Sequence, residues 1–197
     1  MIRLTLILPV LLLTLLVGSP ASADFQKGWD AAQKGDHATA LKEWMPLAKQ
    51  GNVGAQFNLG VMYEKGNGVP QGYKIAINLY KLSAEQGYFF AQYNLGVMYD
   101  NGLGVPQDYK TAIKWYKLAA EQGYADVQYN LGTMYVNGTG TLQDYTRAHM
   151  WWNIAASQGD KGARTDRDKV EKRMPPTQLE TAQQLARECV QKNYKGC

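Results

Sequence analysis

Residues that could carry out nucleophilic or acid–base chemistry are few in this chain. After residue 23 the serines are Ser83 and Ser157, each in the last turn of an expected helix and neither in a Ser-x-x-Lys motif. The histidines are His37, in an expected turn, and His149, in an expected helix. A nucleophile needs a base within hydrogen-bond reach, and the sequence indicates no such pair. We therefore predict a non-catalytic protein.

Metal and redox chemistry are not indicated either. The two cysteines, Cys189 and Cys197, lie near the C-terminus without Cys-x-x-Cys spacing or nearby histidines, so neither a zinc pattern nor a redox pattern is present. In an oxidising compartment two such cysteines can close a small terminal loop. We expect a structural disulfide or two idle thiols, with no metal ion and no cofactor.

Residues 1–23 are typical of a cleaved signal peptide. Arg3 precedes an apolar run from Leu4 to Val17, and small residues end the segment at Ala23, which predicts cleavage after Ala23. The alternative is a retained membrane anchor, but the run is shorter than the roughly 20 apolar residues of a spanning helix. We therefore expect a periplasmic or secreted protein without stable membrane insertion after cleavage.

The charge balance gives no support to nucleic acid as a partner. The chain has 21 Lys and Arg against 17 Asp and Glu, a net charge of +4, and these charges are scattered along the sequence. A nucleic-acid or membrane-surface site would show a basic patch. A protein or peptide ligand is the partner class that we expect.

The elements that position the remaining residues are copies of one segment. The sequence from Ala91 to Gly123 recurs 36 positions earlier and, with more substitutions, 36 positions later. A fixed period of this length is typical of stacked helical units, so we predict an all-α solenoid of antiparallel helix pairs, and a monomer. The expected parts are an N-terminal capping helix pair at 24–51, repeats at 52–87, 88–123 and 124–159, and C-terminal capping helices at 160–197. A Thr177 and Glu180 capping box is expected to open the last helix.

Each repeat is predicted to begin with a helix A that has a core side and a free side. In the first repeat, Val53 to Lys65, a wheel of 100° per residue puts Leu59 on the core side and Phe57 opposite. Gly60 interrupts the helix at a cost of about 1 kcal/mol, which close approach of a neighbouring helix would offset. The free side is predicted to bind the partner through three columns: Phe57, Tyr93 and Tyr129; Asn58, Asn94 and Asn130; and Val61, Val97 and Thr133.

The motif AQYNLGVMYDNGLGVPQDYKTAIKWYKLAAEQG resembles the Sel-1-like repeat, a subfamily of the tetratricopeptide-like helical repeats. The resemblance covers Ala55 to about Gly159 and implies a right-handed α-solenoid whose A helices line a concave face and serve as a protein-binding scaffold of the cell envelope. Related proteins use an asparagine before the Leu-Gly pair to hydrogen-bond a peptide; bracing of neighbouring repeats is the alternative use of these amides. Some secreted relatives have been discussed as penicillin-binding or β-lactamase-like, so a hydrolase is the alternative function. The disulfides that staple the repeats of some relatives have no counterpart inside the repeats here.

Overall fold

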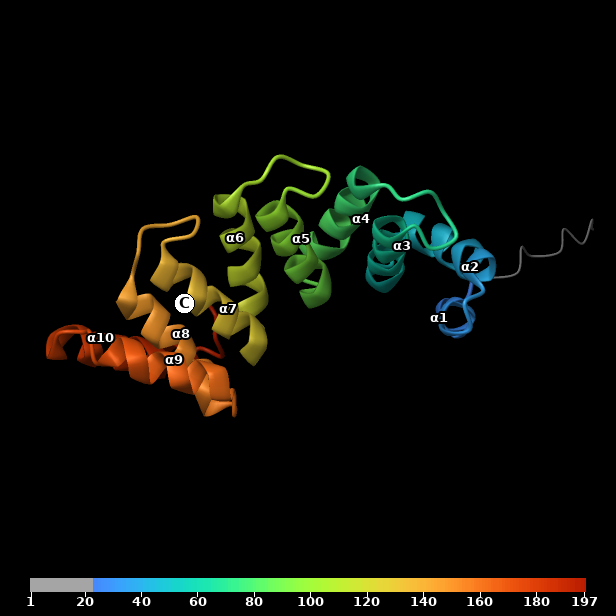
Figure 1. Ribbon diagram of the computed structural model, residues 1–197. Helices are drawn as coiled ribbons and strands as arrows, with labels where there is room; N and C mark the ends of the chain where they lie inside the picture. The colour runs from blue at the N-terminus through green and yellow to red at the C-terminus, as the bar shows by residue number, and fades with distance from the viewer. Residues whose placement is uncertain (1–22) are drawn as a thin grey trace, which may run out of the picture.

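The structure, a computed structural model, describes residues 23–197, so the signal-peptide prediction falls almost wholly outside the described residues. All the regular structure in this part of the chain is α-helical (Figure 1). The helices are α1 (Phe25–Gln33), α2 (His37–Lys49), α3 (Val53–Lys65), α4 (Tyr73–Glu85), α5 (Phe89–Asn101), α6 (Tyr109–Ala120), α7 (Ala125–Asn137), α8 (Tyr145–Ser157), α9 (Lys161–Glu171) and α10 (Pro176–Gln191). None of these helices is long and apolar enough to cross a membrane.

Consecutive helices pack in pairs, and the pairs form a curved row from α1 to α8 (Figure 1). The helices α9 and α10 both pack against α8 and end the row. This arrangement confirms the predicted all-α solenoid. Helix α3 has the bounds expected for helix A of the first repeat, and α5 and α7 are its copies 36 and 72 positions later.

The glycine in the middle of each helix A allows helix B to come close. A Cβ atom on Gly96 would lie 2.5 Å from the Tyr116 ring of α6, and the equivalent approaches are 2.6 Å for Tyr80 on Gly60 and 2.6 Å for Trp152 on Gly132. Real Cβ atoms do not come this near to a ring, because interiors are already close-packed. The aromatic side chain of helix B therefore fills the space that the glycine leaves, and this packing offsets the glycine's low helix propensity.

The loop between helix A and helix B is held at both ends. Gly102 ends α5 with φ of 68°, a left-handed conformation that glycine adopts without strain. The Gln107 side chain donates to the Asp100 carbonyl at 2.7 Å, which satisfies an orphan acceptor of the last helical turn. Gly104 lies against the start of the preceding helix B, where an added Cβ would come within 2.5 Å of the Tyr73 Cβ. Each loop thereby helps to fix the register between repeats.

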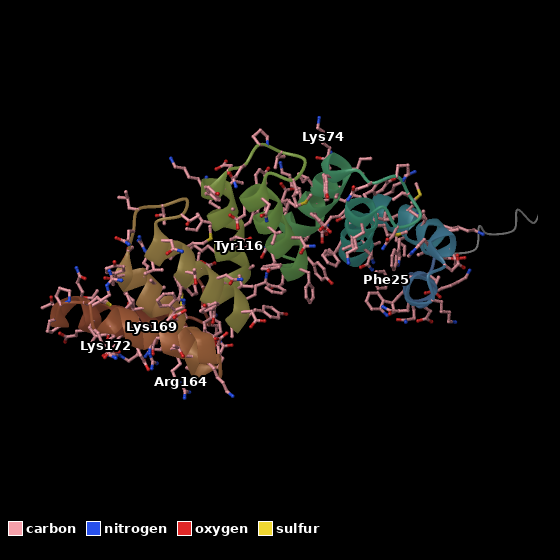
Figure 2. The ribbon with its side chains drawn as sticks, in the orientation of Figure 1. Phe25, Lys74, Tyr116, Arg164, Lys169 and Lys172 are labelled. Atoms are coloured by element: carbon pink, nitrogen blue, oxygen red, sulfur yellow. A yellow bond between two sulfur atoms is a disulfide. The ribbon has the colours of Figure 1, made fainter. Side chains whose placement is uncertain are left out.

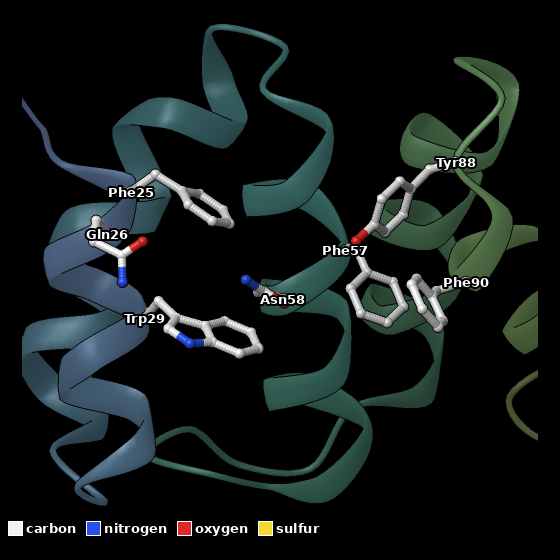
Figure 3. A pocket seen from close by; sticks show the side chains of 7 residues that line it. All are labelled: Phe25, Gln26, Trp29, Phe57, Asn58, Tyr88 and Phe90. Carbon is white, nitrogen blue, oxygen red and sulfur yellow. The ribbon is translucent and has the colours of Figure 1, made fainter.

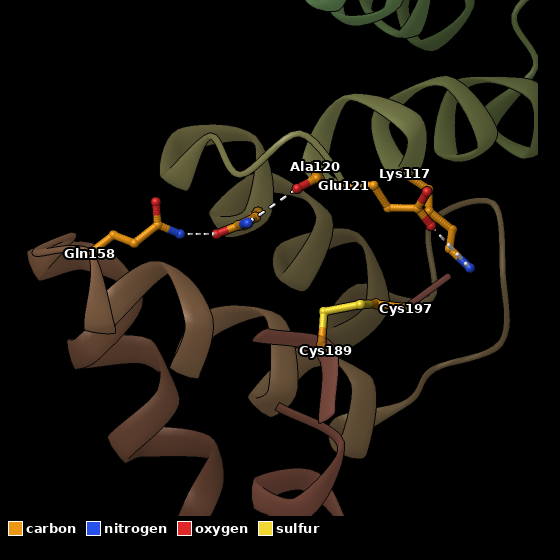
Figure 4. The surroundings of a disulfide bond; sticks show 7 residues. Lys117, Ala120, Glu121, Gln158, Cys189 and Cys197 are labelled. Carbon is orange, nitrogen blue, oxygen red and sulfur yellow. Dashed lines mark hydrogen bonds and ion pairs between the residues drawn. A yellow bond between two sulfur atoms is a disulfide. The ribbon is translucent and has the colours of Figure 1, made fainter. Parts of the chain in front are cut away.

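A relay of glutamine amides joins each repeat to its neighbour, and it was not predicted. Gln122 donates to the Gln92 side chain at 2.8 Å, and Gln92 donates to the Ala84 carbonyl at 3.1 Å. The same bonds recur one repeat earlier, with Gln86, Gln56 and Ala48, and one repeat later, with Gln158, Gln128 and Ala120 (Figure 4). In each relay a buried glutamine of helix A is bonded to an exposed glutamine that follows helix B. Hydrogen bonds to buried amides favour one arrangement of the repeats.

The C-terminal cap ends in a loop closed by a disulfide. Cys189 and Cys197 are bonded at 2.01 Å (Figure 4), and the Tyr194 ring between them lies against Gly123, in the turn between α6 and α7. The predicted capping box is wrong: α10 begins one residue before Thr177, with no side-chain cap bond. Pro176 occupies the first helical position, where its fixed φ and missing N–H suit a helix start.

Candidate functional site

A cavity of about 450 Å³ opens between α1, α3 and the start of α5 (Figure 3). Two adjacent helix pairs and the capping pair contribute to it, so the cavity depends on the stacking of the units. We call it the aromatic groove. Its lining residues are Phe25, Gln26, Trp29, Phe57, Asn58, Tyr88 and Phe90.

Three aromatic side chains of the groove, Phe57, Tyr88 and Phe90, form a connected cluster, and the groove is open to solvent. The Phe57 ring lies 5.2 Å from Tyr88 and 5.9 Å from Phe90, centre to centre. Trp29 is 43% exposed and Phe90 is 48% exposed. Exposed aromatic groups gathered in one cavity are characteristic of binding sites, because each offers a large contact area with little side-chain entropy to lose.

The one amide on the floor of the groove has no partner among the described residues. Asn58 is only 8% exposed, and in Figure 3 its side chain points into the space between Phe25 and Trp29. The amide atoms of Asn58 are not among the buried polar atoms that lack a partner, which indicates that the amide reaches the solvent in the groove. A ligand that offers a backbone N–H or carbonyl group would satisfy it.

Two of the predicted binding residues, Phe57 and Asn58, line the groove, and Val61 lies half-buried one turn further along α3. Eight of the nine predicted side chains are half-buried, and Asn58 is buried. The columns on the free side of helix A are therefore less accessible than a helical wheel suggests. A helical wheel considers one helix at a time, whereas here each aromatic residue of the first column packs against the helix B aromatic ring of its own repeat. The ring pairs are Phe57 with Tyr80, Tyr93 with Tyr116 (the latter labelled in Figure 2) and Tyr129 with Trp152.

In the second repeat the predicted binding residues of α5 lie on the face of the A helices and also take part in packing. Tyr93 lies 5.8 Å from the Tyr116 ring and 6.5 Å from the Phe89 ring, centre to centre. Asn94 lies beside the Tyr80 hydroxyl, and Val97 packs at the edge of the core that α7 and α8 form.

In the third repeat the same positions are covered by α9. The Tyr129 hydroxyl donates to Asp166 of α9 at 3.0 Å, and this bond raises the pKa of Tyr129. Thr133 donates to the Tyr129 carbonyl and lines a separate cavity of about 340 Å³ with Asp166 and Lys169. Asn130 is half-buried. The structure therefore does not bring the third members of the columns to the aromatic groove.

Five lining residues of the groove were missed: Phe25, Gln26, Trp29, Tyr88 and Phe90. Phe25 and Trp29 lie one helical turn apart in the capping pair, a spacing that could have indicated a common face. The run Tyr88-Phe89-Phe90 lies at the start of a repeat, and core packing of one helix does not require three adjacent aromatic residues. Both signals were present in the sequence.

The hydroxyl groups of both serines are used within the fold. Ser83 donates to the Val53 carbonyl at 3.0 Å, and Ser157 donates to the Ile154 carbonyl at 2.7 Å. His149 is 1% exposed, and its Nε2 lies 3.6 Å from a Glu171 carboxylate oxygen. Within residues 23–197 no three His, Cys, Asp or Glu side chains gather as a metal site would require.

Comparison with known proteins identifies the repeat. The Sel1 repeat matches the chain three times, at residues 53–88, 90–124 and 125–160. Among solved structures, a Sel1 repeat protein from Oxalobacter formigenes is 35% identical, with a TM-score of 0.69 over 73% of this chain and 59% of that one. A protective antigen present in uropathogenic Escherichia coli strains, which displays an SLR fold, is 27% identical, with a TM-score of 0.52 over 86% of this chain and 46% of that one. No curated protein matches.

The chain thus spans 59% and 46% of the lengths of these two proteins. Sel1 repeat proteins are generally protein-interaction scaffolds and are typically non-catalytic. The three matches together cover more than half of the sequence. On these matches and on its helix-pair architecture, the chain belongs to the Sel1 repeat family.

Proposed function

We propose that this protein is an exported scaffold of the cell envelope that binds a segment of another protein in the aromatic groove. The observation that carries the proposal is the groove itself, an open cavity of about 450 Å³ lined by five aromatic side chains and one buried amide. Aromatic residues in a pocket are the usual anchors of protein interfaces.

The unpaired Asn58 amide favours a peptide over a purely apolar ligand. It lies between aromatic rings (Figure 3), so a chain laid across it would gain hydrogen bonds to its backbone while its side chains enter the apolar space. Sites of this kind take their affinity from buried apolar anchors and their orientation from a few polar groups. Export rests on the apolar N-terminal segment of the sequence.

The groove is tested with the mature chain, Asp24 to Cys197, as bait for a displayed library of random peptides. Selected peptides should be rich in aromatic and aliphatic residues. They should bind the Trp29→Ala, Phe90→Ala double variant at least tenfold more weakly, because a central aromatic anchor contributes about 2 kcal/mol or more. Fluorescence anisotropy with the labelled peptides measures the change.

The matched control is the double variant Leu82→Ala, Leu118→Ala. These leucines are 50% and 44% exposed on α4 and α6, outside the groove lining, and their loss should leave peptide affinity unchanged. Failure to select any peptide, or equal losses in both variants, would count against the groove as the binding site. Export is tested separately, by fractionation of cells and N-terminal sequencing of the product.

A further inference from the structure

The A-helix face carries two carboxylates that the proposed function leaves unused, and both are held in place by tyrosines of the core. The Tyr80 hydroxyl donates to Glu64 at 2.5 Å, and the Tyr116 hydroxyl donates to Asp100 at 3.4 Å. Both tyrosines are buried. Burial raises the pKa of each, and so does the neighbouring carboxylate, so the tyrosines remain donors and fix the carboxylates.

Neither carboxylate is neutralised within the described part of the chain. No Lys, Arg or His of residues 23–197 forms an ion pair with Glu64 or Asp100, whereas Glu43 and Asp166 each pair with a lysine. Both Glu64 and Asp100 are half-buried. A carboxylate accepts up to about four hydrogen bonds, and each of these receives one from its tyrosine, so capacity for a cation remains.

The third repeat lacks both members of this pair. Val136 stands at the position of Glu64 and Asp100, and Trp152 stands at the position of the two tyrosines. In that repeat α9 covers the face with Asp166 and Lys169. The carboxylates thus occur in the two repeats whose helix B supplies a tyrosine that donates to them.

Glu64 lies on the same side of α3 as the groove residue Phe57, and Asp100 occupies the equivalent position of α5. Glu64 follows Phe57 by seven positions, or nearly two full turns, which places it about 10 Å further along the same face of α3. An extended peptide covers about 10 Å with roughly three residues. The groove is apolar at one end of this span, and negative charge lies at the other.

We infer that the segment bound in the aromatic groove carries a lysine or arginine about three residues from its apolar anchor, and that this basic side chain binds Glu64 and Asp100. The inference rests on the proposed function, and it narrows the partner to apolar segments with an adjacent basic residue. Charge complementarity next to an apolar anchor sets the register and the direction of a bound chain.

The test uses three terminally blocked, fluorescein-labelled peptides that differ at one position. Each has a Phe-Leu pair, a spacer of about three Ser and Gly residues, and then Lys, Ala or Glu; a second set has the reverse order. We expect the Lys peptide of one set to bind about five- to tenfold more tightly than its Glu counterpart, and high salt to reduce the difference.

The double variant Glu64→Gln, Asp100→Asn should abolish this preference and retain binding of the Ala peptide, since amide oxygens can still accept from the tyrosines. Glu85→Gln, Glu121→Gln is the control: it removes two carboxylates from helix B ends, changes the net charge equally, and should keep the preference. A preference that persists in the first double variant, or no preference in the wild type, overturns the inference and leaves the proposed function standing. If no peptide of either set binds, both fail.

Discussion

The two halves of the A-helix face start from nearly the same repeat sequence and end in different states. In the first half, α1, α3 and α5 leave an open cavity in front of Phe57. In the second half, α9 lies in front of Tyr129 and bonds to it through Asp166. The difference teaches that the repeat alone does not determine whether its face is available. The cap that follows the last repeat decides this.

The back of the second half is covered as well. The disulfide holds the C-terminal tail so that Tyr194 reaches the turn between α6 and α7. The largest cluster of buried residues in the described chain is the core that α6 to α10 form. A solenoid needs polar capping ends to stay soluble, and here the cap also packs against the third repeat, outside the proposed binding groove. We call the part that α9 covers the closed half and the part with the aromatic groove the open half. We therefore expect stability to depend on the closed half and binding on the open half.

The largest contrast should come from one tryptophan in each half. Trp152 is 4% exposed, and its Nε1 donates to the Tyr129 carbonyl at 3.0 Å, so Trp152→Ala should lower the free energy of unfolding by about 3–5 kcal/mol. Trp29→Ala should cost about 1 kcal/mol or less while weakening peptide capture. Denaturant unfolding followed by circular dichroism compares them. Equal losses of stability would show that the groove belongs to the core.

The disulfide provides the second contrast, because only the closed half is cross-linked. Its loop has a sequence separation of 8, and closing a loop of this size removes denatured-state entropy worth about 2.5 kcal/mol. Cys197→Ser should therefore lower stability by roughly that amount and leave peptide binding in the groove unchanged. If binding changed with stability intact, the tail would have to act on the open half.

A smaller effect separates two equivalent tyrosines. Tyr129→Phe removes the hydroxyl that bonds to Asp166 and should cost about 1 kcal/mol. Tyr93→Phe, one repeat earlier, removes a hydroxyl that has no hydrogen bond to the described residues, and its cost should be near zero. The difference in denaturation midpoint between the variants measures how firmly α9 closes its half, and a null difference would contradict that closure.

The fold was predictable because its information is local. The 36-residue period, the Gly60, Gly96 and Gly132 column and the loop glycines each follow from short patterns. The groove was only partly predictable, since it forms where three units meet: Phe57 and Asn58 were found from the repeat, whereas Phe25 and Trp29 come from a capping pair that lies outside it. The covering of Tyr129 depends on the direction in which α9 leaves α8, which no spacing in the sequence encodes.

The smallest and most selective difference between the two halves concerns His149. The equivalent residue in the open half is an isoleucine, Ile77. The His149 ring is buried, and neither nitrogen has a hydrogen-bond partner in the described residues. Burial lowers the pKa of His149 from its ordinary 6.5, while the Glu171 carboxylate opposes this shift; Arg167 and Asp168 of α9 act in opposite directions.

The unfolded chain therefore takes up a proton at His149 at a higher pH than the folded chain does. Stability from this site is fully present above about pH 6.5 and is lost as the pH falls through that value toward the folded pKa. The melting temperature should decline between about pH 7 and pH 5. Asp166 and Glu43 do not contribute in this range, because their pKa values are lowered from ordinary values of 3.8 and 4.5. His149→Ile should flatten this decline and, by removing two unpaired buried nitrogens, add about 1 kcal/mol of stability. If the pH dependence is unchanged in that variant, the titration belongs to another group, and His149 of the closed half is not its source.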